Sequence, residues 1–112
     1  MKTRSLIALG FAGVAMLAAG AAAGQDKYPS KPIRLVVPFA PGGSSSIVAR
    51  AFGTEMSRIL GQEIIIDNRP GGAGNIAMEA VAKADPDGYT LVMGHIGSLA
   101  VNPFMFSKLP FD

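Results

Sequence analysis

The chain has 112 residues, enough for one small domain, and it contains no cysteine, which excludes a disulfide framework and a cysteine-based metal or redox site. Its 10 basic and 8 acidic residues give a formal net charge of only +2. After residue 23 there is no basic run and no basic–aromatic pattern, so the charge predicts no nucleic-acid partner.

Residues 1–23 are expected to form a cleavable secretory signal. Lys2 and Arg4 give the segment a positive start, an uncharged apolar run follows over residues 6–17, and small residues precede position 24. This order is typical of a signal that is removed after export. The alternative is a membrane anchor, but the apolar run is short for a span of about 20 residues. Residues 24–112 are therefore expected in the periplasm, without stable membrane insertion after cleavage.

Residues 27–32 contain two prolines and are expected to form an extended lead-in. A strand and then a helix are predicted after it. The β-branched run at residues 33–39 is typical of a strand buried on both faces. A turn at residues 41–46 follows, and any of its three serines could cap the first turn of the helix. Apolar residues then recur at three- and four-residue steps, and Gly61 stands where the helix should end. The apolar face consists of Ile47, Val48, Ala51, Phe52, Met56, Ile59 and Leu60.

The same pattern occurs a second time. Residues 63–67 predict a buried strand, and a turn over residues 68–74 leads into a second helix. The apolar stripe of this helix consists of Ile76, Ala80, Val81 and Ala84. The turn chemistry of residues 85–88 ends the helix.

A third strand is predicted at residues 89–93, with an exit loop at residues 94–98. A short helix is expected from about Leu99, and Asn102 with Pro103 interrupts or restarts it. Three strands that alternate with helices over short links predict an α/β fold: a parallel sheet with flanking helices and right-handed crossovers.

Three glycine-rich corners are expected to meet at the carboxyl edge of this sheet, where α/β folds hold their ligands. They are residues 39–46, 68–75 and 94–98. Glycine lets backbone N–H groups approach a ligand, and a helix N-terminus adds partial positive charge, so such corners bind anions. The alternative for any one corner is that its glycines only make a tight turn.

Residues 72–77 fit the dinucleotide-binding pattern G-x-G-x-x-G/A between a strand and a helix. Two observations weigh against a nucleotide. The motif begins several residues after the strand, and the acidic residue expected about 20 positions later is missing from residues 92–95. A small dinucleotide-binding enzyme domain therefore remains only as an alternative.

Support for catalysis is thin. His95 is the only histidine and Ser98 lies near it, but no acidic residue completes a triad and no G-x-S-x-G elbow occurs. A lone histidine in a loop is more often a hydrogen-bonding or surface residue. One histidine without cysteine also makes no transition-metal site. We therefore expect no catalytic residue, metal or cofactor, and a hydrolytic domain remains an alternative.

Several short motifs follow in order along the chain. They lie at residues 28–34, 37–43, 47–50, 68–71, 74–75, 86–91, 102–103 and 109–112. In these motifs the chain, from Tyr28 to Asp112, resembles the Bug-type extracytoplasmic solute receptors of tripartite tricarboxylate transporters.

The resemblance implies a two-lobed periplasmic-binding-protein-like fold of type II, of which residues 24–112 would be a partial first lobe. Such a receptor is not an enzyme; it closes on a small carboxylated solute and delivers it to membrane permease subunits. In the family, neutral donors and ordered water hold the carboxylate at the first and third corners. Carried over, this assigns ligand binding to Phe39, Gly42, Gly43, Ser44, Ser45, Gly97 and Ser98, with Gly74 and Asn75 added at the second corner.

The chain departs from the family pattern in three ways. Ser46 stands where the family often has aspartate, although serine can still cap a helix. Leu99 stands in the third loop where the family more commonly has a small or polar residue. A full-length member also carries a second lobe, and a small-ligand pocket needs two walls. The chain is therefore expected to be a fragment or truncated product with weak or absent binding, and a non-binding remnant is a further alternative.

Overall fold

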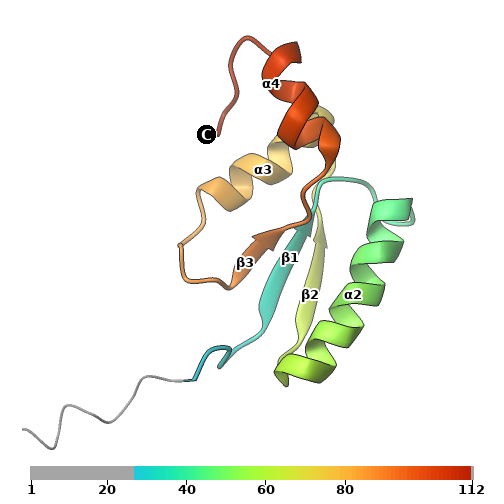
Figure 1. The fold of residues 1–112 in the computed structure, drawn as a ribbon, viewed down its shortest axis with the longest axis vertical. Coiled ribbons are helices and arrows are strands. Elements are labelled where there is room, and N and C mark those ends of the chain that lie inside the picture. Colours follow the sequence, from blue (N-terminus) through green and yellow to red (C-terminus); the bar gives the residue numbers. More distant parts are fainter. Residues whose placement is uncertain (1–26, 112) are drawn as a thin grey trace, which may run out of the picture.

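A computed structural model describes residues 27–111 as a three-stranded parallel sheet with helices on both faces (Figure 1). The strands are β1 (Ile33–Val37), β2 (Ile64–Asn68) and β3 (Thr90–Val92), in the order β2-β1-β3. Leu35 at the centre of β1 pairs with Ile66 on one side and Leu91 on the other. The predicted α/β fold with parallel strands is confirmed. The predicted secretory signal at residues 1–23 lies outside the described residues.

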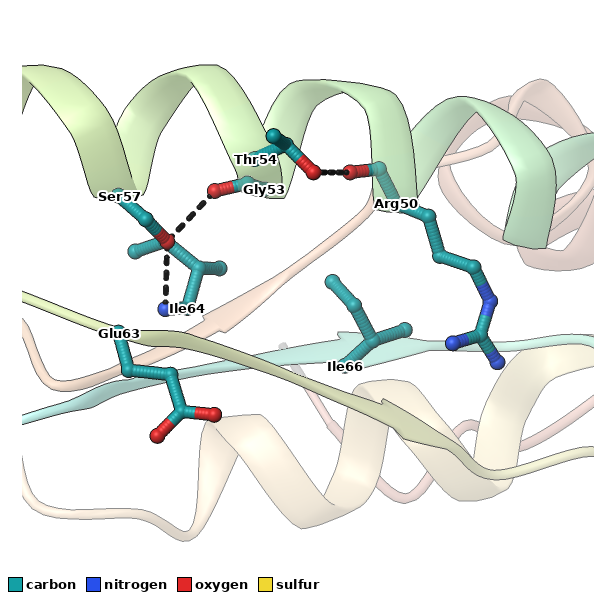
Figure 2. Close-up of a pocket in the computed structure, with 7 residues that line it drawn as sticks. All are labelled: Arg50, Gly53, Thr54, Ser57, Glu63, Ile64 and Ile66. Atoms are coloured by element: carbon teal, nitrogen blue, oxygen red, sulfur yellow. Dashed lines mark hydrogen bonds between the residues drawn. The ribbon is translucent and has the colours of Figure 1, made fainter.

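The helices cover the two faces of the sheet unequally. Helix α2 (Ser44–Leu60) packs on β2 and β1, and α3 (Asn75–Ala82) packs on β3 and β1 from the opposite face (Figures 1 and 2). A 3₁₀ turn, η2 (Gly72–Gly74), precedes α3. A π-helical turn, η3 (Gly97–Val101), continues into the short helix α4 (Asn102–Met105). Among the helices of residues 27–111, none combines the length and apolar character that a membrane span requires.

Helix α2 packs on the sheet through small residues, and not through its predicted apolar face. Its buried residues are Ser46, Ala49 and Gly53. A Cβ added at Gly53 would lie 3.2 Å from Cδ1 of Ile66, so any larger residue there would require the Ile66 side chain to shift. The predicted apolar face is instead largely exposed, at Ile47, Val48, Ala51, Phe52, Ile59 and Leu60. The periodicity locates this face on the helix but does not determine which face meets the sheet.

The stripe predicted for the second helix is also only partly correct. Ala77 is buried, Ile76 is exposed, and Ala84 lies beyond the end of α3. The buried side of this short helix is built from Asn75 and Ala77 at its N-terminal end. The helix starts at the second corner, where the buried side chain of Asn75 accepts a hydrogen bond from Asn102.

The predicted ends of the other elements are closer to the structure. Gly61 ends α2 with a φ of 68°, and its amide donates to the carbonyl of Ser57 over 3.0 Å, as a helix C-terminus requires. The short helix predicted from Leu99 begins two residues earlier, and Asn102 restarts it as α4, with Pro103 in its first turn.

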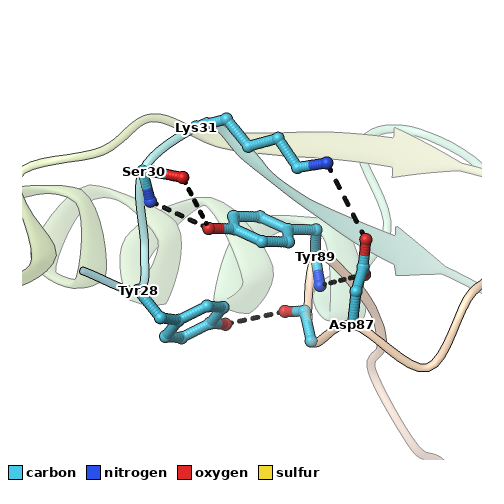
Figure 3. A network of polar contacts seen from close by, with 6 residues as sticks. Tyr28, Ser30, Lys31, Asp87 and Tyr89 are labelled. Carbon is cyan, nitrogen blue, oxygen red and sulfur yellow. Dashed lines mark hydrogen bonds and ion pairs between the residues drawn. The ribbon is translucent and has the colours of Figure 1, made fainter. Parts of the chain in front are cut away.

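Polar contacts fasten the lead-in to the edge of the sheet opposite the three corners (Figure 3). The hydroxyl of Tyr28 donates to the carbonyl of Gly88 over 2.7 Å, and the amide of Ser30 donates to the hydroxyl of Tyr89 over 2.8 Å. The ammonium group of Lys31 lies 4.5 Å from the centre of the Tyr89 ring. The start of β1 is thereby tied to the start of β3.

Candidate functional site

The three glycine-rich corners lie together at the carboxyl edge of the sheet, because the strands that precede them run parallel. Gly74 in the second corner lies against Ser98 of the third corner and against Pro38, which directly precedes the first corner. A Cβ added at Gly74 would lie 3.4 Å from Cβ of Pro38 and 3.4 Å from Cβ of Ser98. The predicted meeting of the corners at one edge is therefore confirmed.

Two adjoining hollows lie at this edge, above the N-terminus of α2. One has a volume of about 280 Å³ and is lined by Phe39, Gly43, Ser44, Ser45 and His95. The other, of about 270 Å³, shares the last three residues and adds Val48, Met93 and Gly94. Four of the nine predicted ligand-binding residues therefore line a hollow, and a role for them in binding remains a prediction.

The N-terminus of α2 presents free backbone donors to these hollows. Gly43 is the residue before the helix, and the first helical hydrogen bond runs from the amide of Ile47 to its carbonyl over 3.0 Å. Within residues 27–111, the amides of residues 44–46 have no acceptor. Such amides, with the positive end of the helix dipole, favour a negatively charged group.

The prediction that a serine caps α2 is wrong. No side chain caps the helix, and Ser46 is fully buried with its hydroxyl donating to Oδ1 of Asn68 over 3.5 Å. Nδ2 of the same asparagine donates to the carbonyl of Phe39 over 2.9 Å. The third serine therefore helps to hold the first corner on β2, and it leaves the helix amides free.

His95 stands at the centre of the site, which the sequence pattern did not predict. Its ring meets the ring of Phe39 edge to face, with the centroids 4.9 Å apart and the planes at 77°. The amide of Gly97 donates to Nδ1 over 3.0 Å, so in the neutral ring Nε2 carries the proton and is a donor. The one available signal was a lone histidine at the end of a strand.

The other five predicted residues lie around the hollows without lining them. Gly42 is exposed in the first turn, and the amide of Gly97 is taken by His95. Ser98 is buried, and its hydroxyl donates to the carbonyl of His95 over 3.1 Å. Gly74 lies against Pro38 and Ser98, and Asn75 is buried beside it. Whether these five contact a ligand remains a prediction.

Two larger hollows lie away from the corners. One, of about 500 Å³, runs between α2 and the outer edge of β2 and has Arg50 and Glu63 among its lining residues (Figure 2). The other, of about 480 Å³, lies beside the lead-in and is lined by charged residues that include Lys31 and Asp87. Neither contains a predicted site residue or one of the three corners, so the smaller hollows at the edge remain the candidate site.

Residues 48–112 match the family described as "Tripartite tricarboxylate transporter family receptor". The chain belongs to this family. It is a family of transporter receptors and not of enzymes, which confirms the resemblance and argues against the dinucleotide and hydrolytic alternatives.

Individual proteins of the family show the same likeness. A UPF0065 protein of Bordetella pertussis is 44% identical over 99% of this chain and 34% of its own length. Among solved structures, an R. palustris protein with adipate is 40% identical, with a TM-score of 0.73, over 76% of this chain and 28% of that one. MatC of Rhodopseudomonas palustris, with bound malate, is 44% identical, with a TM-score of 0.70, over 73% of this chain and 28% of that one. The chain thus spans about a third of the length of the curated relative.

Proposed function

We propose that residues 24–112 form one lobe of a periplasmic receptor for a small carboxylated solute, which serves a tripartite tricarboxylate transporter through its membrane permease subunits. Residues 1–23 would direct the export of this lobe and then be removed. The observation that carries the proposal is the free N-terminus of α2, where Ser44 and Ser45, whose amides have no acceptor within residues 27–111, line the hollows beside His95.

The composition of the hollows supports an anionic ligand. Their lining includes hydroxyl groups, backbone amides and one imidazole, and it includes no aspartate or glutamate. A carboxylate can accept hydrogen bonds from several such donors without meeting a like charge. Two of the solved relatives carry adipate and malate, which are dicarboxylates.

The size of the hollows supports a site that is shared with further chain. Each is below or near the lower limit of the roughly 300–1,000 Å³ that is usual for small-molecule pockets. A single wall leaves much of a ligand in water. We therefore expect this chain alone to bind a dicarboxylate with a Kd in the millimolar range, which corresponds to a binding free energy of about −4 kcal/mol.

The proposal can be tested by titrating the ¹⁵N-labelled chain with adipate and malate and following the backbone amides by NMR. Adipamide, which is the uncharged diamide of adipate, and NAD serve as controls. Dicarboxylates should shift the amides of residues 44–46 and the loop around His95, whereas the two controls should not. Shifts produced by NAD alone, or no shift at these residues with millimolar dicarboxylate, would overturn the proposal.

A proline substitution can remove one of the helix amides without disturbing the helix. Position 44 is the first residue of α2, where proline is favoured, and Gly43 already has the extended conformation (φ −73°, ψ 165°) that a following proline requires. Ser44→Pro should weaken dicarboxylate binding about tenfold, because a hydrogen bond to a charged group is lost. Ser44→Ala keeps the amide and should bind nearly as the parent chain does. Equal affinities for both variants would argue against binding by the helix amides.

A further inference from the structure

Two asparagine side chains form hydrogen bonds that support the first and second corners. Asn68, at the end of β2, bonds to the first corner through the carbonyl of Phe39. Asn102, at the start of α4, reaches back to the second corner from a position that is 4% exposed. The function proposed above uses neither side chain, and Asn102 lies outside all three predicted corners.

The hydrogen bonds of Asn102 determine the orientation of the side-chain amide of Asn75, that is, whether its oxygen or its nitrogen faces Asn102. Nδ2 of Asn102 donates to the backbone carbonyl of Ala73 over 3.0 Å and to Oδ1 of Asn75 over 2.7 Å. A backbone carbonyl can only accept, so the group that faces it must be the NH₂ of Asn102. The same NH₂ then requires an acceptor from Asn75, which turns Oδ1 of Asn75 toward Asn102 and Nδ2 away from it.

The Nδ2 of Asn75 is a donor without a partner among the described residues. Asn75 is 8% exposed, and within residues 27–111 no acceptor pairs with its Nδ2. In the same part of the chain, every fully enclosed side-chain nitrogen or oxygen has a hydrogen-bond partner. This Nδ2 must therefore retain contact with solvent although its residue is nine-tenths buried. Asn75 directly follows Gly74, which lies against Pro38 and Ser98.

We propose that Asn102 is a positioning residue, which locks the amide of Asn75 so that its N–H donors, and not its carbonyl oxygen, are offered to a carboxylate at this edge of the sheet. The inference rests on the proposed function. An amide in the opposite orientation would present a carbonyl oxygen and repel an anion. Asn102 lies 27 residues further along the chain. Its hydrogen bond thus determines whether Asn75 offers a donor or an acceptor to a ligand.

Asn102→Asp is the sharpest test, because it keeps the shape of the side chain and removes its donors. The carboxylate would draw the NH₂ of Asn75 inward and turn its carbonyl oxygen outward. We expect the side-chain ¹⁵N–¹H signals of Asn75 to shift on addition of adipate in the parent chain. In the variant we expect them to be shifted already without ligand and no longer to respond, and the Kd for adipate to rise at least about tenfold, the effect of losing a hydrogen bond to a charged group.

Ser57→Ala serves as the matched control, since it removes a part-buried hydrogen bond near the opposite end of α2. It should lower stability and leave the Kd for adipate unchanged, which separates loss of binding from general loss of stability. An unchanged Kd in Asn102→Asp would overturn the inference. So would a response of the amides of residues 44–46 without one from the Asn75 side chain, although the proposed function would then stand. If neither group responds in the parent chain, the proposed function and this inference both fall.

Discussion

Gly74 lies between Pro38, which precedes the first corner, and Ser98 of the third corner. Its φ of 91° lies in the region that side chains with a Cβ rarely adopt. Two Cβ atoms, from Pro38 and Ser98, stand at 3.4 Å from where its own would be. The backbone conformation therefore favours glycine at this position, and a Cβ there would meet both neighbours at the lower limit of ordinary van der Waals contact.

Gly74→Ala should lower the free energy of unfolding by more than the roughly 1–2 kcal/mol expected for a positive φ alone. Gly61→Ala is the matched variant, because Gly61 has a φ of 68° and nothing within 4 Å of an added Cβ. Urea unfolding of both variants compares strain with and without the contacts. Equal losses of unfolding free energy in the two variants would show that the contacts with Pro38 and Ser98 add nothing to the cost of the positive φ.

Among the elements, α2 depends on one hydroxyl as well as on its small buried face. Oγ of Ser57 accepts from the amide of Ile64 over 3.0 Å and donates to the carbonyl of Gly53 over 2.7 Å (Figure 2). β2 has a neighbouring strand on one side only, so this amide has no partner within the sheet. Ser57 thus joins the helix to the edge strand and satisfies an edge amide.

Ser57→Ala should destabilise the fold by about 1–2 kcal/mol, because it leaves the part-buried amide of Ile64 without its acceptor. Thr54→Ala is the control in the same hollow, since the hydroxyl of Thr54 bonds only to the carbonyl of Arg50 in its own helix. That change should stay within about 0.5 kcal/mol. Chemical denaturation measures both variants, and a loss of similar size in each would contradict the link between α2 and β2.

In the whole molecule, the core is small and centred on β1. Ile33, Val36 and Val37 of this strand are almost fully buried, with Ala49 and Ala77 against them from the two helices. The apolar face of α2 contributes little to this core. The same type of side chain should therefore have very different effects on stability at different positions.

Ile33→Ala and Ile59→Ala compare one substitution at two depths. Ile33 is 1% exposed, and its truncation should cost about 2–5 kcal/mol through lost burial and a cavity. Ile59 is 70% exposed on a helix, where alanine is favoured, so its truncation should change stability by less than about 0.5 kcal/mol. Thermal unfolding measures the stability of both variants, and sedimentation shows whether the chain associates in solution. A large loss at Ile59 would mean that the face of α2 is covered in solution, contrary to its exposure.

The sequence by itself determined the order of elements, the parallel sheet, the meeting of the glycine corners and the end of α2 at Gly61. These features depend on the spacing of apolar residues and on turn chemistry, which act over a few neighbouring residues. The motifs after Tyr28 likewise indicated the receptor family that residues 48–112 match.

The tertiary structure alone decided which face of α2 packs, that no serine caps the helix, and that His95 lies at the centre of the site. It also brought Asn102 against Asn75, from 27 residues away. Periodicity locates an apolar face but not its partner, and the hydrogen-bond partner of a buried polar side chain is set by long-range packing. Such contacts exist only once the strands have placed the corners side by side.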